Sequence, residues 1–207
     1  DLWLKEGFAT FVGYQLLDAL EPERVAWLRF HQRVKPRAYN IDATPGTTPV
    51  YQHLENLADA KSAYGAIVYN KAPAVLRELH ARIGTVHFRD GMRLFLKEHE
   101  FANARWNDLV ESFERTSGRD LEPWSQRWIL ASGMPRVRAE WRADATHTVT
   151  DFALVQESVQ GDEGAWPLEF ELLWIDTNGE QERLRITMTE LRQPLEEVIG
   201  RKAPACV

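Results

Sequence analysis

The sequence contains one cysteine in 207 residues, Cys206, so no disulfide can form within the chain. It also lacks any apolar run near the roughly eighteen residues that a membrane-spanning helix needs. Basic residues are not in excess either, because the net charge is −6 at pH 7. We therefore expect no bilayer span and no nucleic-acid partner, and the unpaired cysteine favours a reducing, cytoplasmic location.

What the sequence does contain is ample material for a folded core. Hydrophobic residues make up 44% of the chain and include 8 tryptophans and 9 phenylalanines. Apolar residues recur at helical spacing up to about Pro135 and alternate with polar residues after it. This change predicts an α+β protein with a helical domain over residues 1–135 and a small β-sandwich domain over residues 136–207.

Proline and glycine positions predict where the helices begin and end. The first helix is expected to run to about Leu20, and a second to open at Glu21-Pro22-Glu23 and stop before Pro36. Residues 36–52 break the periodicity with proline, glycine and polar residues, which predicts a loop longer than usual, of a kind that is often functional or mobile. Further helices are expected from Thr85 to Glu100, from Trp106 to Ser117, and around Trp124 and Trp128.

After Pro135 the alternation of apolar and polar residues predicts strands. The segments are Val137–Trp141, Thr148–Val155, Trp166–Ile175 and Arg183–Met188. The run Asp176-Thr177-Asn178-Gly179 between the last two is typical of a hairpin turn.

Glu6 is a single carboxylate among large apolar residues in the first helix. On that helix it shares a face with Leu2, Ala9, Thr10 and Gly13, and because three of these are small we expect another backbone to approach there. A carboxylate fixed in this way suits a metal ligand. An ordinary half-buried glutamate paired with lysine or arginine is the more common case, and the local pattern leaves both readings open.

Tyr69 precedes a helix with a clear apolar stripe. The stripe consists of Val75, Leu76, Leu79 and Ile83, and Gly84 ends the helix. We expect Asn70 to be the N-cap and Tyr69 to lie just outside the positive helix end, where its hydroxyl could bind developing negative charge. A core or capping tyrosine is the more frequent role at such a position.

Both segments resemble the aminopeptidase N-like zinc metallopeptidases, whose catalytic helix carries an H-E-x-x-H motif. Leu2-Trp3-Leu4-Lys5-Glu6-Gly7-Phe8-Ala9-Thr10-Phe11 is similar to the asparagine-Glu-Gly-Phe-Ala run that supplies their third zinc ligand, with Lys5 in place of the asparagine. Tyr69-Asn70-Lys71-Ala72 is similar to their tyrosine-x-lysine-glycine motif, with Ala72 in place of the glycine. The resemblance implies that Glu6 is a metal ligand and that the catalytic Tyr69 hydroxyl stabilises the tetrahedral intermediate.

The resemblance also implies the helical second half of a thermolysin-like catalytic domain, followed by a small β-sandwich domain. The two histidines and the general base would lie before Asp1, and the sandwich would be cut short near Val207. None of the 6 histidines of the chain stands in the arrangement of a zinc helix. We therefore expect one zinc ion in the full-length enzyme, none in this fragment, and no other cofactor.

The predicted function is that of a zinc aminopeptidase fragment. The parent enzyme would hydrolyse N-terminal residues from peptides, its substrate partners, and the fragment alone would be inactive. The alternative is a non-catalytic protein-interaction module that keeps the fold and a binding surface. The presence of both Glu6 and Tyr69 favours the enzyme, because a scaffold has no use for the pair.

Overall fold

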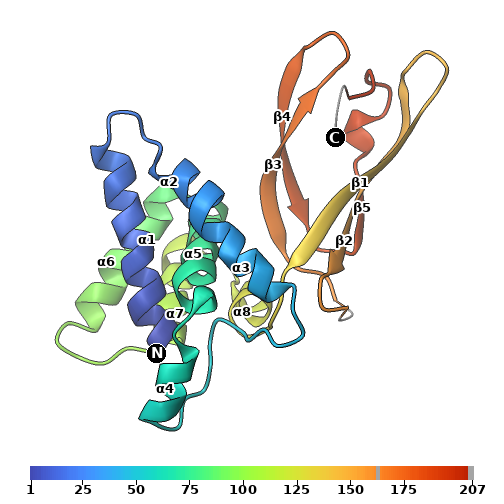
Figure 1. The fold of residues 1–207 in the computed structure, drawn as a ribbon. Coiled ribbons are helices and arrows are strands. Elements are labelled where there is room, and N and C mark those ends of the chain that lie inside the picture. Colours follow the sequence, from blue (N-terminus) through green and yellow to red (C-terminus); the bar gives the residue numbers. More distant parts are fainter. Residues whose placement is uncertain (162–163, 205–207) are drawn as a thin grey trace. The chain divides into compact units, whose positions relative to one another are not determined.

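The computed structural model describes residues 1–161 and 164–204, so Cys206 and Val207 lie outside the described residues. The chain divides into two compact units, Asp1–Met134 and Pro135–Val207. Helices build the first unit and strands the second, as the ribbon in Figure 1 shows. The predicted α+β class is therefore confirmed.

The first unit contains eight α-helices among the described residues. They are α1 (Leu2–Leu20), α2 (Ala26–Arg29), α3 (Lys35–Asp42), α4 (Leu57–Ala63), α5 (Ala72–Ile83), α6 (Thr85–Glu98), α7 (Trp106–Ser117) and α8 (Glu122–Trp128). Two π-helical turns, Phe30–Val34 and Ile67–Lys71, lead directly into α3 and α5. Helix α1 ends where the sequence predicts, and Gly84 and Gly118, both with positive φ, end α5 and α7.

The prediction for residues 21–52 is wrong in two respects. The second helix begins at Ala26 instead of at the Glu21-Pro22-Glu23 step, and the chain stays helical through Pro36 to Asp42. A proline inside a regular α-helix clashes with the carbonyl four residues before it. Here Pro36 follows the wider π turn Phe30–Val34, whose backbone bonds reach five residues ahead, and this turn accommodates the ring. The loop is therefore shorter than predicted and begins at Ala43.

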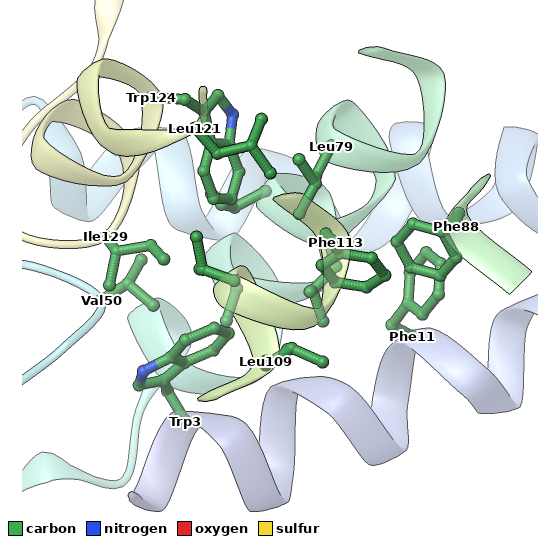
Figure 2. Packing of buried hydrophobic residues seen from close by; sticks show 14 of the residues in the cluster. Trp3, Phe11, Val50, Leu79, Phe88, Leu109, Phe113, Leu121, Trp124 and Ile129 are labelled. Atoms are coloured by element: carbon green, nitrogen blue, oxygen red, sulfur yellow. The ribbon is translucent and has the colours of Figure 1, made fainter. Parts of the chain in front are cut away.

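A single hydrophobic cluster holds the first unit together. Figure 2 shows Trp3 and Phe11 projecting from α1 into this cluster beside Leu109, Phe113 and Phe88. Trp3 is 2% exposed and Phe11 1%, so both ends of this stretch of α1 are anchored in the core. Burying large side chains of this kind stabilises the fold by about 1.5–3 kcal/mol each. Residues between the two anchors are consequently held in fixed positions.

The second unit consists of two antiparallel sheets. One sheet has the strand order β1 (Pro135–Ala143), β2 (Val149–Ser158), β5 (Arg192–Pro194), and the other pairs β3 (Leu168–Ile175) with β4 (Gln181–Met188). A 3₁₀ turn, Glu196–Val198, follows β5. The predicted hairpin at Asp176–Gly179 is present, with Ile175 paired to Gln181 and Gly179 at φ 84°. Strand β5 has no counterpart among the predicted strands, because three residues are too few for a visible alternation.

The two sheets share an apolar interior. The ring centroids of Phe152 on β2 and Trp174 on β3 lie 5.4 Å apart. A buried amide, that of Gln156, donates to the carbonyls of Trp166 and Glu190 and accepts from the Trp166 backbone N–H. Across the described parts of both units, no helix has the length and apolar character needed to cross a membrane.

Candidate active site

Glu6 lies on α1 between the two core anchors Trp3 and Phe11. Its side chain is 18% exposed, so the carboxylate is partly shielded from water but still reachable. Lys5, whose side chain is 74% exposed, forms an ion pair with it at 3.1 Å. The helix fixes the position of this carboxylate, and one neighbouring cation neutralises it.

The close backbone approach predicted beside Glu6 occurs on an adjacent side of α1. A Cβ atom added to Gly13 would have no neighbour within 4 Å, and Ala9 is exposed. At Gly7, by contrast, an added Cβ would come 2.5 Å from the Cβ of Ala72 and 3.0 Å from the carbonyl oxygen of Val68. The expectation is therefore correct about a close approach near Glu6 and wrong about the residue that permits it. The approaching segment is the π turn that precedes α5.

Tyr69 belongs to this π turn, Ile67–Lys71, instead of lying outside a helix end. Because the π turn begins at Ile67 and continues without a break into α5, Tyr69 lies inside the first turn of the combined helix and not beyond its N-terminus. Asn70 is not an N-cap either; its side-chain amide donates to the carbonyl of Val34 at 3.1 Å. Tyr69 is 36% exposed, and its ring stacks on Tyr64 with centroids 6.2 Å apart.

The fold brings Tyr69 and Glu6 together although they are far apart in the sequence. A hydrogen bond from Lys5 and a further one from Tyr69 lower the pKa of the Glu6 carboxyl, against partial desolvation. Partial burial and the hydrogen bond to Glu6 raise the pKa of Tyr69. At neutral pH the carboxylate is thus charged, and the phenol keeps its proton as a hydrogen-bond donor.

The chemistry of the available donors decides whether a metal could be held. A catalytic zinc site uses about three protein ligands. Within the described residues, no group of three or more histidine, cysteine, aspartate or glutamate side chains could hold a metal ion. Glu6 fits the part of one ligand, since its carboxylate is fixed and partly shielded.

A buried ion pair next to Tyr69 is the feature that sequence reasoning missed. Lys71 and Asp42 lie 2.9 Å apart, and their side chains are only 5% and 3% exposed. Lys71 matched the family motif in the sequence, but no local pattern pairs it with Asp42, which was expected in a loop. A buried lysine is unusual enough to need a partner, and only the three-dimensional structure identifies it.

This chain is similar to known proteins in both fold and sequence. The fold is similar to that in the "Crystal structure of Legionella pneumophila aminopeptidase A in complex with aspartic acid", with a TM-score of 0.72 at 19% identity, over 94% of this chain and 21% of that one. This chain therefore shares its fold with about a fifth of that protein. The family description "Peptidase family M1 domain" matches residues 1–128, and the chain belongs to this family.

Relatives of known name are similar in sequence as well. The chain is 36% identical to "Aminopeptidase N" of Streptomyces lividans over 160 residues, which are 76% of this chain and 19% of that protein. It is 33% identical to "Leucyl aminopeptidase" of Saccharolobus solfataricus over 138 residues, 67% of this chain and 18% of that protein. The resemblance to aminopeptidase N-like metallopeptidases is confirmed. The chain spans about a fifth of the length of these relatives.

Proposed function

We propose that this chain is part of a zinc-dependent aminopeptidase that removes N-terminal residues from peptides. The observation that carries the proposal is that the π turn with Tyr69 lies against α1 beside Glu6, close enough for each of the two residues to shift the pKa of the other. The resemblance assigns these two residues to a metal and to an oxyanion, and two such groups must lie within one substrate's reach. Family membership over residues 1–128 and the names of the relatives support the same reaction class.

In this proposal the unit Asp1–Met134 is the helical part of the catalytic domain and Pro135–Val207 a separate β domain. Zinc, when bound, supplies Lewis-acid activation of water. Glu6 offers one anionic oxygen ligand, and the helix that carries it keeps that oxygen in place. Two histidine ligands and a glutamate base would come from an H-E-x-x-H helix elsewhere in the protein.

Tyr69 has the role of the oxyanion donor. A hydroxyl that stays protonated can donate a hydrogen bond to the oxygen of the tetrahedral intermediate as negative charge develops there. The raised pKa of Tyr69 keeps the phenol in its protonated form, in which it can donate. The hydroxyl would leave Glu6 for the substrate oxygen when a peptide is bound.

The test uses a protein that includes the H-E-x-x-H helix, loaded with zinc. It is incubated with a peptide carrying a free N-terminus and with the same peptide acetylated at the N-terminus. Release of the first residue from the free peptide alone is expected. Binding of the peptide without any cleavage would instead favour the alternative, a non-catalytic interaction module on the same fold.

A further inference from the structure

Behind Tyr69, the buried ion pair of Lys71 and Asp42 connects four segments of the first unit. The Lys71 ammonium lies 2.9 Å from Oδ2 of Asp42 at the end of α3 and donates to the Gly133 carbonyl at 2.6 Å. The hydroxyl of Thr47 donates to Oδ1 of Asp42 at 2.9 Å. The π turn, the end of α3, the following loop and the segment after α8 therefore meet at one charged centre.

Stability alone is a poor reason for burying these charges. Desolvation of two ions offsets much of their attraction, and replacing a buried pair with apolar residues of similar size is often neutral or stabilising. The pKa of Lys71 is lowered by burial, although Asp42 acts against this shift, so desolvation acts strongly on this group. Unlike apolar packing, an ion pair depends on direction and distance. It therefore fixes the position of the joined segments relative to one another.

The residue between Tyr69 and Lys71 forms a second connection to the same region. Asn70 donates from its side chain to the carbonyl of Val34, the last residue of the π turn before α3. The two residues that follow Tyr69 thus both bind the segment formed by that turn and α3. Val68, on the other side of Tyr69, is 1% exposed and contacts α1 near Gly7. Tyr69 itself is the exposed residue of a turn fixed on both sides.

We propose that Lys71 and Asp42 are positioning residues that hold the π turn so that the Tyr69 hydroxyl faces Glu6. The inference rests on the proposed function for its catalytic meaning, but the placement of Tyr69 can be measured without any catalysis. Neither residue touches the reacting atoms in this scheme. Lys71, which matches the lysine of the family motif, acts through the backbone of the turn.

The experiment compares the 207-residue chain with the variants Lys71→Met, Asp42→Leu and the double variant. Tyrosine rings are labelled with ¹³C, and the signals of Tyr69 and Tyr64 are assigned with Tyr69→Phe and Tyr64→Phe. Melting temperature reports stability, while the Tyr69 signals and the cross-relaxation between the stacked Tyr64 and Tyr69 rings report placement. Each single variant is expected to melt lower, because it leaves one buried charge without its partner.

The double variant separates positioning from stability. It is expected to recover a melting temperature close to that of the original chain while the Tyr69 signals stay displaced and the cross-relaxation with Tyr64 falls. Arg82→Met is the matched control, since it removes a long cation from α5 that pairs with Glu78 instead. It should lower stability without moving the Tyr69 signals. Recovery of both stability and the original Tyr69 signals in the double variant would overturn the proposal.

A milder variant covers the case in which the double variant does not fold. Asn70→Ala removes only the bond to Val34 and is expected to displace the Tyr69 signals in a chain that keeps its fold. Unchanged Tyr69 signals in Asn70→Ala and in whichever Lys71 or Asp42 variants fold would equally overturn the proposal.

In a zinc-loaded protein that cleaves peptides, the double variant should lower kcat by about tenfold or more with little change in KM. If the unmutated protein cleaves nothing, the proposed function fails, whereas the placement result stands.

Discussion

Gly7 on α1 and Ala72 at the start of α5 lie so close that a Cβ on Gly7 would be 2.5 Å from the Cβ of Ala72. Real Cβ atoms do not approach each other that closely, so the absence of a side chain at Gly7 permits the contact. The same approach places the π turn with Tyr69 beside the turn of α1 that carries Glu6. The glycine after Glu6 therefore has a geometric role in the site, which the sequence pattern attributed to the small residues Ala9, Thr10 and Gly13.

Substitution of the two glycines of α1 should have opposite effects on stability. Gly7→Ala is expected to destabilise the chain by about 1–3 kcal/mol, because the methyl group must push α1 away from Ala72 and Val68. Gly13→Ala should stabilise it by about 0.5–1 kcal/mol, since the helix gains a better former and the methyl group meets nothing within 4 Å. Denaturant unfolding of both variants measures the difference. Equal effects at the two positions would contradict the close contact at Gly7.

Much of the helical architecture could be predicted from the sequence because it depends on local signals. Apolar spacing and glycine ends locate α5, α6 and α7, and the Asp176–Gly179 turn locates the β3–β4 hairpin. The π turns could not be predicted in this way. A π turn depends on what packs against it, and proline rules derived from regular α-helices place a break at Pro36 where the wider turn prevents one.

In the candidate site, too, local features could be predicted from the sequence and tertiary contacts could not. Local sequence identified Glu6 as a fixed carboxylate, but the catalytic interpretation of Tyr69 came from resemblance, and its predicted placement outside the helix end is wrong, since it lies inside the first turn. The proximity of Tyr69 to Glu6 and the pairing of Lys71 with Asp42 both bring together segments that are distant in the chain. Such pairings depend on tertiary packing, which periodicity in a single sequence does not encode.

Lys5 should weaken metal binding at Glu6. Its ammonium lies 3.1 Å from the carboxylate and competes with a divalent cation for the same oxygen. In a protein that includes the zinc helix, Lys5→Asn is expected to tighten zinc binding about threefold, in line with the modest strength of exposed ion pairs. Competition with a chelator of known affinity measures it. Lys97→Asn, which removes an exposed lysine from α6, is the control and should leave zinc affinity unchanged.

His80 should make the stability of the first unit depend on pH. The indole N–H of Trp27 donates to Oε1 of Gln15, so the other end of the Gln15 amide, its N–H group, faces His80 and donates to Nδ1. Because Nδ1 accepts this hydrogen bond, it carries no proton, and the imidazole is neutral. Burial and the nearby Arg77 lower the pKa of His80 from its usual 6.5. Nε2 faces the hydroxyl of Thr85, and Arg77 is the charged group that faces the ring.

The direction of the pH dependence of stability follows from the lowered pKa of His80. Above pH 6.5 the imidazole is neutral in both states, and its full contribution to stability is present. As the pH falls below this value, the unfolded chain takes up a proton that the folded chain resists, so the free energy of unfolding decreases until the folded pKa is passed. Denaturant unfolding between pH 8 and pH 5 should show a smaller decrease in His80→Gln than in the unmutated chain. His53→Gln, at an exposed position, should leave the decrease unchanged.

The 207-residue chain by itself should bind no stoichiometric zinc and cleave no aminoacyl reporter substrate. Glu6 is the one residue that the resemblance assigns to the metal, and a single carboxylate holds zinc too weakly to survive dialysis. Elemental analysis after dialysis, together with a reporter assay in added zinc, measures both quantities. About one zinc ion retained per chain would contradict the assignment and point to a different set of ligands.

The variants Glu6→Ala and Tyr69→Phe should separate metal binding from catalysis in a zinc-loaded protein that contains the complete site. Glu6→Ala removes an anionic ligand, so zinc content and turnover should fall together, and excess zinc should restore activity only in part.

Tyr69→Phe keeps the ring stacked on Tyr64 and removes only the hydroxyl. Its zinc content should stay normal while kcat falls by roughly a hundredfold or more, because the oxyanion loses a donor. Tyr14→Phe, which changes a tyrosine packed against Trp27 and Phe30, is the matched control and should keep normal turnover. If Tyr69→Phe also turns over normally, Tyr69 is a surface-packing residue and the oxyanion role belongs to another group.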